Sequence, residues 1–291
     1  MLGRAAGALA LAGAATLAWS LAEAHAFTLR RVTVPALPAG SEPLRILHLS
    51  DLHLTPGQRD KIAWVRALGA EPVDLVVTTG DNLAHQLAVP PLLGAYEPLM
   101  RHPGVFVFGS NDYVAPRPKN PFTYFTGPTG LHEKHVALPT EDLRTGLVDG
   151  GWVDLNNARA ALTVNGLKIR FVGLDDPHID RDQLPGGRRP SADLTLGVVH
   201  APYLRALQAL ADDGAELILA GHTHGGQVCI PGYGALVTNC DLDTTRVKGL
   251  SHWPDAAGAW LHVSAGLGTS PYAPVRLACR PEATILTLVA A

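Results

Sequence analysis

Short apolar runs alternate with helical patterns through the first half of the chain. Residues 45–50, 74–79 and 105–108 are apolar runs of strand length, and each is followed at once by polar or charged residues. Apolar side chains recur at helical spacing in residues 58–68, and a second helix is expected over 90–100, where proline stands at the start. Strands alternating with helices predict an α/β fold built on a largely parallel sheet.

The second half of the chain contains more strands. Asn165-Gly166 predicts a tight hairpin turn, and a helix is expected over residues 202–211. A possible edge strand at residues 28–34 precedes the rest. Seven further strands are expected, at residues 160–164, 168–173, 194–199, 216–220, 227–230, 260–264 and 284–289. The last three are expected to complete a second sheet.

The amino-terminal segment is a targeting or anchoring sequence. Residues 5–22 carry no charge and lie between Arg4 and Glu23, close to the minimum length that spans a bilayer. A cleaved signal peptide and an uncleaved anchor both fit, since small residues suitable for cleavage occur at 22–26. We expect an outward-facing domain. The predicted division is a signal or anchor at 1–26, an approach segment at 27–44 and a catalytic domain at 45–291.

Composition excludes one class of partner and leaves the redox state open. The formal charge of −3 over 291 residues provides no basic face, so no nucleic acid partner is implied. Cys229 and Cys240 bracket a turn-rich segment, which suggests a disulfide between them. The alternative is that the three cysteines are small buried hydrophobic residues.

Ligand-type side chains follow the predicted strands, at the sheet edge where open α/β folds build their sites. His222 and His224 follow the run 216–220, and two residues apart on an extended backbone they can face one site. Asp81, alone after Gly80, suits a carboxylate shared by two cations. Oxygen and imidazole ligands predict two divalent ions, with Mn²⁺, Fe or Zn²⁺ equally compatible. The seven predicted ligands are Asp51, His53, Asp81, Asn111, His200, His222 and His224.

Five sequence blocks in this order resemble the calcineurin-like metallophosphoesterases. They are Asp51-Leu52-His53, Gly80-Asp81-Asn82, Gly109-Ser110-Asn111-Asp112, Val199-His200 and Gly221-His222-Thr223-His224. The resemblance implies one metal held by Asp51, His53 and His224. It implies a second metal held by Asn111, His200 and His222, with Asp81 between the two. The sequences around the first and last blocks look like a membrane-associated bacterial branch that includes a UDP-diacylglucosamine pyrophosphatase type.

The fold and the reaction follow from this resemblance. It implies a four-layer αββα sandwich of two mixed β-sheets flanked by helices, preceded by the hydrophobic segment. It also implies hydrolysis of a phosphate ester or phosphoanhydride by a metal-bridged hydroxide. A phosphodiesterase acting on lipid or nucleotide diesters would share every ligand. A membrane-tethered metal-binding module without turnover is the remaining alternative.

The third block departs from the family pattern, which has His after the ligand Asn. Either Ser110 replaces the ligand, or Asn111 is the ligand and Asp112 stands in place of the histidine that protonates the leaving group. We favour Asn111, because a neutral amide oxygen is the better ligand. The expected general acid is then missing, which predicts a preference for good leaving groups unless Asp112 or His178 donates the proton.

The long segment 113–151 is predicted to form a rim over the site. Its residues Arg117 and Lys119 are candidates for binding a phosphate of the substrate. The expected partners are therefore a phosphorylated small molecule or lipid-linked substrate, and a membrane contacted by the amino-terminal segment.

Overall fold

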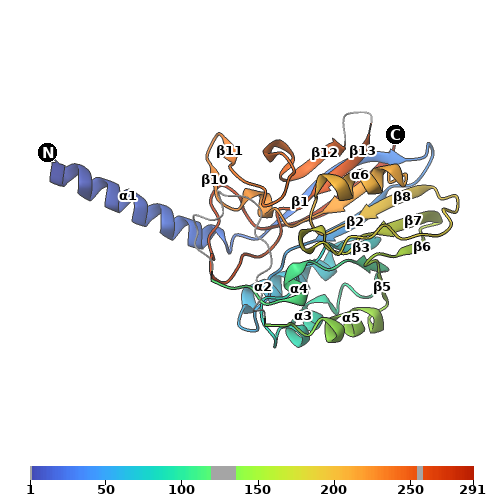
Figure 1. The fold of residues 1–291 in the computed structure, drawn as a ribbon, viewed down its shortest axis with the longest axis horizontal. Helices are drawn as coiled ribbons and strands as arrows, with labels where there is room; N and C mark the ends of the chain where they lie inside the picture. Colours follow the sequence, from blue (N-terminus) through green and yellow to red (C-terminus); the bar gives the residue numbers. More distant parts are fainter. Residues whose placement is uncertain (1, 119–135, 254–257) are drawn as a thin grey trace.

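Two six-stranded sheets face each other and helices cover their outer faces (Figure 1). This computed structural model describes residues 2–118, 136–253 and 258–291. The first sheet has the order β1 (Thr28–Leu37), β14 (Glu282–Ala290), β2 (Leu44–Leu49), β3 (Leu75–Thr78), β4 (Gly104–Phe106), β5 (Trp152–Asp154). The second has the order β12 (Gly249–Trp253), β13 (Ala259–Val263), β9 (Leu217–Ala220), β8 (Leu194–Val198), β7 (Leu167–Gly173), β6 (Arg159–Val164). The predicted α/β sandwich of two mixed sheets is confirmed.

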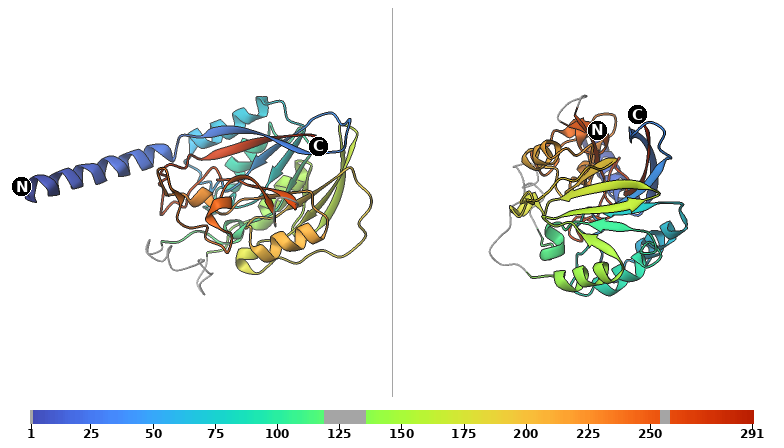
Figure 2. Two further views of the ribbon diagram at one scale, coloured as in Figure 1. Left: turned by 90° about the horizontal axis from the view of Figure 1, so that it is seen from above. Right: turned by 90° about the vertical axis from the view of Figure 1, so that its right-hand side faces the viewer.

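The layer between the sheets explains why the central strands are apolar without alternation. Ile46 of β2, Val77 of β3 and Val105 of β4 pack against Leu196 of β8 and Leu219 of β9. The opposite face of the first sheet is covered by α2 (Arg59–Ala67), α3 (Val89–Tyr96) and α5 (Thr140–Asp149), and that of the second by α6 (Leu204–Asp212). Both faces of these strands are therefore buried (Figure 2), as is typical of parallel strands.

The last strands of the chain are arranged differently from the prediction. β14 lies in the first sheet, parallel to β1 and antiparallel to β2, so its assignment to the second sheet is wrong. The strand predicted at 227–230 is reduced to β10 (Cys229–Ile230), which forms a separate hairpin with β11 (Gly234–Ala235). Of these three runs, 260–264 alone enters the second sheet, as β13. Apolar patterning marks a buried strand but does not identify its neighbours.

The segment expected as an approach, 27–44, supplies β1 at the edge of the first sheet. Helix α1 (Leu2–Glu23) extends away from the domain (Figure 2) and contains one stretch, Ala6–Glu23, long and apolar enough to cross a membrane. A signal sequence would meet the same criterion. The last turn of α1 nevertheless belongs to the domain, because the Glu23 carboxylate accepts hydrogen bonds from the backbone N–H groups of Ala278 and Cys279.

Candidate metal centre

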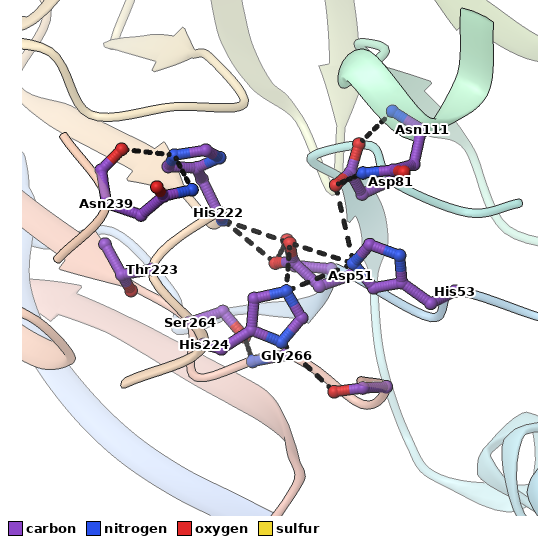
Figure 3. Close-up of polar contacts among 12 residues, drawn as sticks. Asp51, His53, Asp81, Asn111, His222, Thr223, His224, Asn239, Ser264 and Gly266 are labelled. Atoms are coloured by element: carbon purple, nitrogen blue, oxygen red, sulfur yellow. Dashed lines mark hydrogen bonds and ion pairs between the residues drawn. The ribbon is translucent and has the colours of Figure 1, made fainter. Parts of the chain in front are cut away.

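The carboxyl ends of five strands bring the predicted ligands to one edge of the sandwich (Figure 3). β2 is followed by Asp51 and His53, and its parallel neighbour β3 is followed by Asp81. In the facing sheet, the parallel strands β8 and β9 deliver His200 and the His222 turn. Parallel pairing within each sheet therefore gathers these side chains, as the sequence predicted.

One group consists of Asp51, His53 and His224. The Nε2 atoms of His53 and His224 are 3.1 Å apart, and Asp51 Oδ1 lies 3.5 Å from the His224 nitrogen. Burial lowers the pKa of His53 to about 4 and that of His224 well below its usual value, so both rings are neutral. His224 Nδ1 donates to the Gly268 carbonyl, which leaves its Nε2 lone pair directed toward His53. Two neutral imidazole rings whose Nε2 atoms meet beside a carboxylate fit a cation.

A second group consists of Asp51, Asp81 and His200. His200 Nδ1 donates to the Thr79 carbonyl at 2.6 Å, so Nε2 is the ring nitrogen left to face the site. That Nε2 is buried, has no hydrogen-bond partner in the described chain and lies 3.5 Å from Asp81 Oδ2. The same oxygen is 3.4 Å from His53 Nε2, so Asp81 stands between the two groups. Asp51 belongs to both groups, and Asp81 contacts one histidine of each group. Either carboxylate could therefore be shared by two cations.

The backbone at these residues adopts a conformation that side chains rarely tolerate. Asp51, His53, Asp81, His222 and His224 all have φ between 42° and 69°. Each left-handed residue other than glycine costs on the order of 1–3 kcal/mol and persists where the surrounding fold enforces it. Their concentration at one sheet edge marks this edge as the functional site.

Comparison with known proteins agrees with this geometry. Residues 44–226 match the calcineurin-like phosphoesterase family. The chain belongs to this family. Metallophosphoesterase YkoQ of Bacillus subtilis is 28% identical over 254 residues, covering 85% of this chain and 84% of the relative. Phosphodiesterase YaeI of Escherichia coli is 26% identical, covering 90% and 88%, and a bovine transmembrane protein with a metallophosphoesterase domain is 29% identical, covering 93% and 58%. The chain is accordingly a hydrolase that acts on phosphate esters.

In this phosphoesterase, Asn111 makes two hydrogen bonds to the Asp81 carboxylate. Its backbone N–H donates to Asp81 Oδ1 at 2.7 Å and its side-chain amide donates to Oδ2 at 2.8 Å (Figure 3). Asn111 is the second residue of the short helix α4 (Ser110–Tyr113) after β4, and Ser110 Oγ lies 3.4 Å from its amide nitrogen. The contacts make Asn111 an orienting partner of Asp81, with its amide beside the metal centre.

Asp112 is fully buried behind the ligands. One carboxylate oxygen accepts the Asn82 backbone N–H at 2.8 Å, and the other accepts that of Gly109 at 3.0 Å. Burial, together with the charge of Asp81, raises the pKa of Asp112 to about 7. Its hydrogen bonds join the loop after β3 to the loop after β4, which is a positioning arrangement.

His222 is turned toward the rim of the site. Its Nε2 donates to the Asn239 carbonyl at 3.1 Å (Figure 3), and its ring centroid is 5.2 Å from that of His200. The ring of His178 lies beside it at a tilt of 48°, with 4.5 Å between ring centroids, and its Nδ1 is 3.1 Å from the Tyr203 hydroxyl. A titratable imidazole therefore stands next to the predicted ligand His222.

Arg276 was not anticipated from the sequence. Its fully buried guanidinium donates to the carbonyl oxygens of Ala265, Gly268 and His224, at 2.7, 2.7 and 3.2 Å. These bonds join the His224 turn to the loop after β13. An isolated arginine among proline, glycine and apolar residues was the available signal, and a single sequence does not distinguish it from a surface arginine.

Glycines allow these loops to pack closely. A Cβ on Gly266 would lie 2.5 Å from Asp51 Cβ, and one on Gly268 would overlap the Leu52 carbonyl. Gly268 N–H also donates to the Asp51 carbonyl. The Gly266-Leu-Gly268 segment thus supports the Asp51 loop.

Gly109 provides a test of this packing. A Cβ there would overlap Asp81 Oδ1 and lie 2.7 Å from the His200 ring. We expect Gly109→Ala to lower kcat by about 10²-fold through misplacement of these two side chains. Gly94 in α3, where a Cβ meets nothing within 4 Å, is the matched control. Gly94→Ala should leave kcat unchanged, and equal rates for both variants would contradict the packing argument.

The remaining predicted residues lie outside the two groups. Arg117 is half-buried in the segment after α4, and Lys119 lies outside the described residues. His48 of β2 is buried and contacts His262 and Thr79.

The three cysteines are free thiols, so the suggested Cys229–Cys240 disulfide is wrong. The hairpin carries Cys229 inward instead, where its sulfur and that of Cys279 both lie within hydrogen-bond distance of the Gly225 carbonyl. The turn residues between Cys229 and Cys240 form a hairpin whose register pairs Cys229 with Ala235.

Proposed function

We propose that this phosphoesterase is a dinuclear phosphohydrolase. In this proposal Asp51, His53 and His224 hold one divalent ion and Asp81 and His200 hold the other, with Asn111 and His222 completing the second site. The observation that carries the proposal is the convergence of the His53, His224 and His200 Nε2 atoms on the carboxylates of Asp51 and Asp81. When bound, two such ions polarise a phosphoryl oxygen and acidify a water molecule.

The surrounding residues support this assignment through charge and orientation. Burial acts to lower the pKa of His200, but the charges of Asp81 and Asp176 raise it well above its usual value, so the local field attracts positive charge. Asn111 fixes the Asp81 carboxylate with two hydrogen bonds. Asp112 is a positioning residue in this proposal, and His178 lies beside His222 with its Nδ1 near the Tyr203 hydroxyl. Mn²⁺, Fe and Zn²⁺ all suit the ligand set.

The third block favours a substrate with a good leaving group. The histidine expected to protonate the leaving group is replaced, and the Asn111 amide is hydrogen-bonded to Asp81. An ester or anhydride with an acidic leaving group needs less protonation. The similarity to phosphodiesterase YaeI supports a diester in particular. We therefore propose a diester or a phosphoanhydride, with a lipid-linked or small phosphorylated substrate, and a membrane-tethered domain outside the cytoplasm.

The function is tested with the purified full chain in mild detergent. Added Mn²⁺ should support hydrolysis of a bis-aryl phosphate in preference to an aryl phosphate monoester. Across a series of aryl diesters, the rate should fall steeply as the leaving-group pKa rises, because a strong general acid is missing. A flat series would contradict the proton-donor argument. A silent protein with every substrate and metal would indicate the binding module instead.

A further inference from the structure

An apolar patch lies on the hairpin that follows the metal ligands. We define the hairpin patch as Val228, Ile230, Tyr233, Leu236 and Tyr272, which are between 43% and 77% exposed. The loop that carries Tyr272 is bound to the hairpin, since the Gln227 amide donates to the Ala273 carbonyl. Large apolar side chains gathered on one protrusion mark a surface that contacts something other than water.

The exposure follows from the register of the hairpin. Cys229 pairs with Ala235, and both pack inward with Val247, Ala265 and Cys279. Val228 and Ile230 flank Cys229, and Leu236 follows Ala235, so strand alternation places these three side chains on the outer face. The inner face is filled, so the outer side chains have no route into the core.

The hairpin is attached to the end of α1 by one intervening segment. Leu277 pairs with Val228, and the backbone N–H of Arg276 donates to the Ser20 carbonyl of α1 at 2.9 Å. Figures 1 and 2 show α1 leaving the domain from the end that carries β10 and β11. Trp19, in the last turns of α1, is 58% exposed. Tryptophan and tyrosine are the residues that favour the boundary between lipid and water.

The metal centre lies at this same end of the molecule. The Arg276 side chain donates to the His224 carbonyl while its backbone is bound to Ser20, so a single residue connects a predicted ligand to α1. Lys248 is exposed, and its Nζ is 3.6 Å from the Sγ of Cys279, which packs with Cys229 and Ala235 of the hairpin. Basic side chains beside an apolar surface suit an anionic lipid headgroup region.

We propose that the hairpin patch inserts into the headgroup region of the same bilayer that α1 enters. The domain then has two contacts with the membrane, and the metal-bearing edge faces the lipid surface. Resting on the proposed function, this orientation assigns as substrate a phosphate ester or anhydride carried by a membrane lipid. We favour a bilayer over a second copy of the chain as the binding partner. The patch is connected to the last turns of α1 through Arg276 and Leu277, and its two tyrosines are of the type that favours the lipid–water boundary.

The insertion is tested on the full chain in vesicles of phosphatidylcholine and phosphatidylglycerol that contain nitroxide-labelled lipid. Val228→Cys and Val148→Cys each receive a nitrobenzoxadiazole label, and the labelled parent protein gives the background of native thiols. Val148 is the matched control, since it is 48% exposed against 45% for Val228 and lies on α5, on the other side of the domain in Figure 1.

Lipid-borne quenching at position 228 should exceed that at 148 at least twofold, with emission shifted to shorter wavelength. Equal quenching at the two positions would overturn the proposal. A further outcome is a label at 228 that lipid leaves unquenched while its emission shifts only at high protein concentration. That result would indicate self-association and would also overturn the proposal.

The substrate assignment has a separate test. Val228→Asp combined with Ile230→Asp should retain the rate on a soluble aryl diester in detergent and lose at least tenfold on a phospholipid substrate embedded in vesicles. Equal losses on both substrates, or none on either, would overturn the assignment. Absence of turnover in the parent protein would refute the proposed function and leave the quenching result standing.

Discussion

Replacing Asp81 with asparagine is expected to lower kcat/KM by about 10³-fold, equivalent to about 4 kcal/mol of transition-state stabilisation. The Asp81 carboxylate lies 3.4 Å from His53 Nε2 and 3.5 Å from His200 Nε2, between both groups of ligands. Asparagine keeps the shape but removes the charge. It also offers one acceptor to the two N–H groups with which Asn111 holds Asp81. Steady-state kinetics on an aryl diester with saturating Mn²⁺ measures the loss.

Asp180→Asn is the matched control for this substitution. Asp180 has nearly the same backbone conformation, with φ of 55° against 53° for Asp81, but its side chain is 89% exposed. Its ion pair with Arg205 is a surface contact of small energetic value. The control should retain kcat/KM and melting temperature. An Asp81→Asn protein as active as the Asp180→Asn protein would exclude Asp81 from the metal centre.

Replacing Arg276 with alanine is expected to lower the free energy of unfolding by at least about 3 kcal/mol. The guanidinium is fully buried and satisfies carbonyl groups of Ala265, Gly268 and His224, which alanine would leave without donors. Each buried polar group that loses its partner costs about 1–3 kcal/mol. Activity should fall as well, because the His224 turn loses its connection to the loop after β13. Equilibrium urea unfolding in detergent gives the stability.

Arg66→Ala provides the comparison for Arg276. Arg66 pairs with Glu97 on the surface, where both side chains are more than half exposed, and such pairs contribute about 0–1 kcal/mol. Unfolding free energies that agree within error for the two variants would show that the Arg276 contacts do not stabilise the fold.

The residues at the ends of the strands were predictable from this sequence, whereas the neighbours of each strand within its sheet were not. Asp51, Asp81 and His200 each follow a run of apolar residues, and parallel pairing places Asp51 beside Asp81 in the first sheet and His200 at the corresponding edge of the second. β14 has an equally clear apolar pattern, but its position between β1 and β2 depends on contacts more than 230 residues apart, such as Thr284 with His48. Periodicity carries no information on such pairings.

The supporting residues of the site were the least predictable. Asp112 has the chemistry of a proton donor, and its location behind Gly109 is determined by backbone N–H groups that the sequence does not display. Arg276 binds carbonyl groups, which every residue carries, so its spacing from other residues forms no pattern. A ligand set has a recognisable chemical composition, whereas the shell that orients it is defined by three-dimensional contacts.

Crystals of the full chain soaked in Mn²⁺ and measured at the manganese absorption edge test the central claim most directly. We predict two anomalous peaks per chain, one contacted by Asp51, His53 and His224 and the other by Asp81 and His200. An Asp81→Asn crystal treated in the same way should lose at least one of them. The absence of any peak at these side chains, or peaks elsewhere on the protein, would contradict the account.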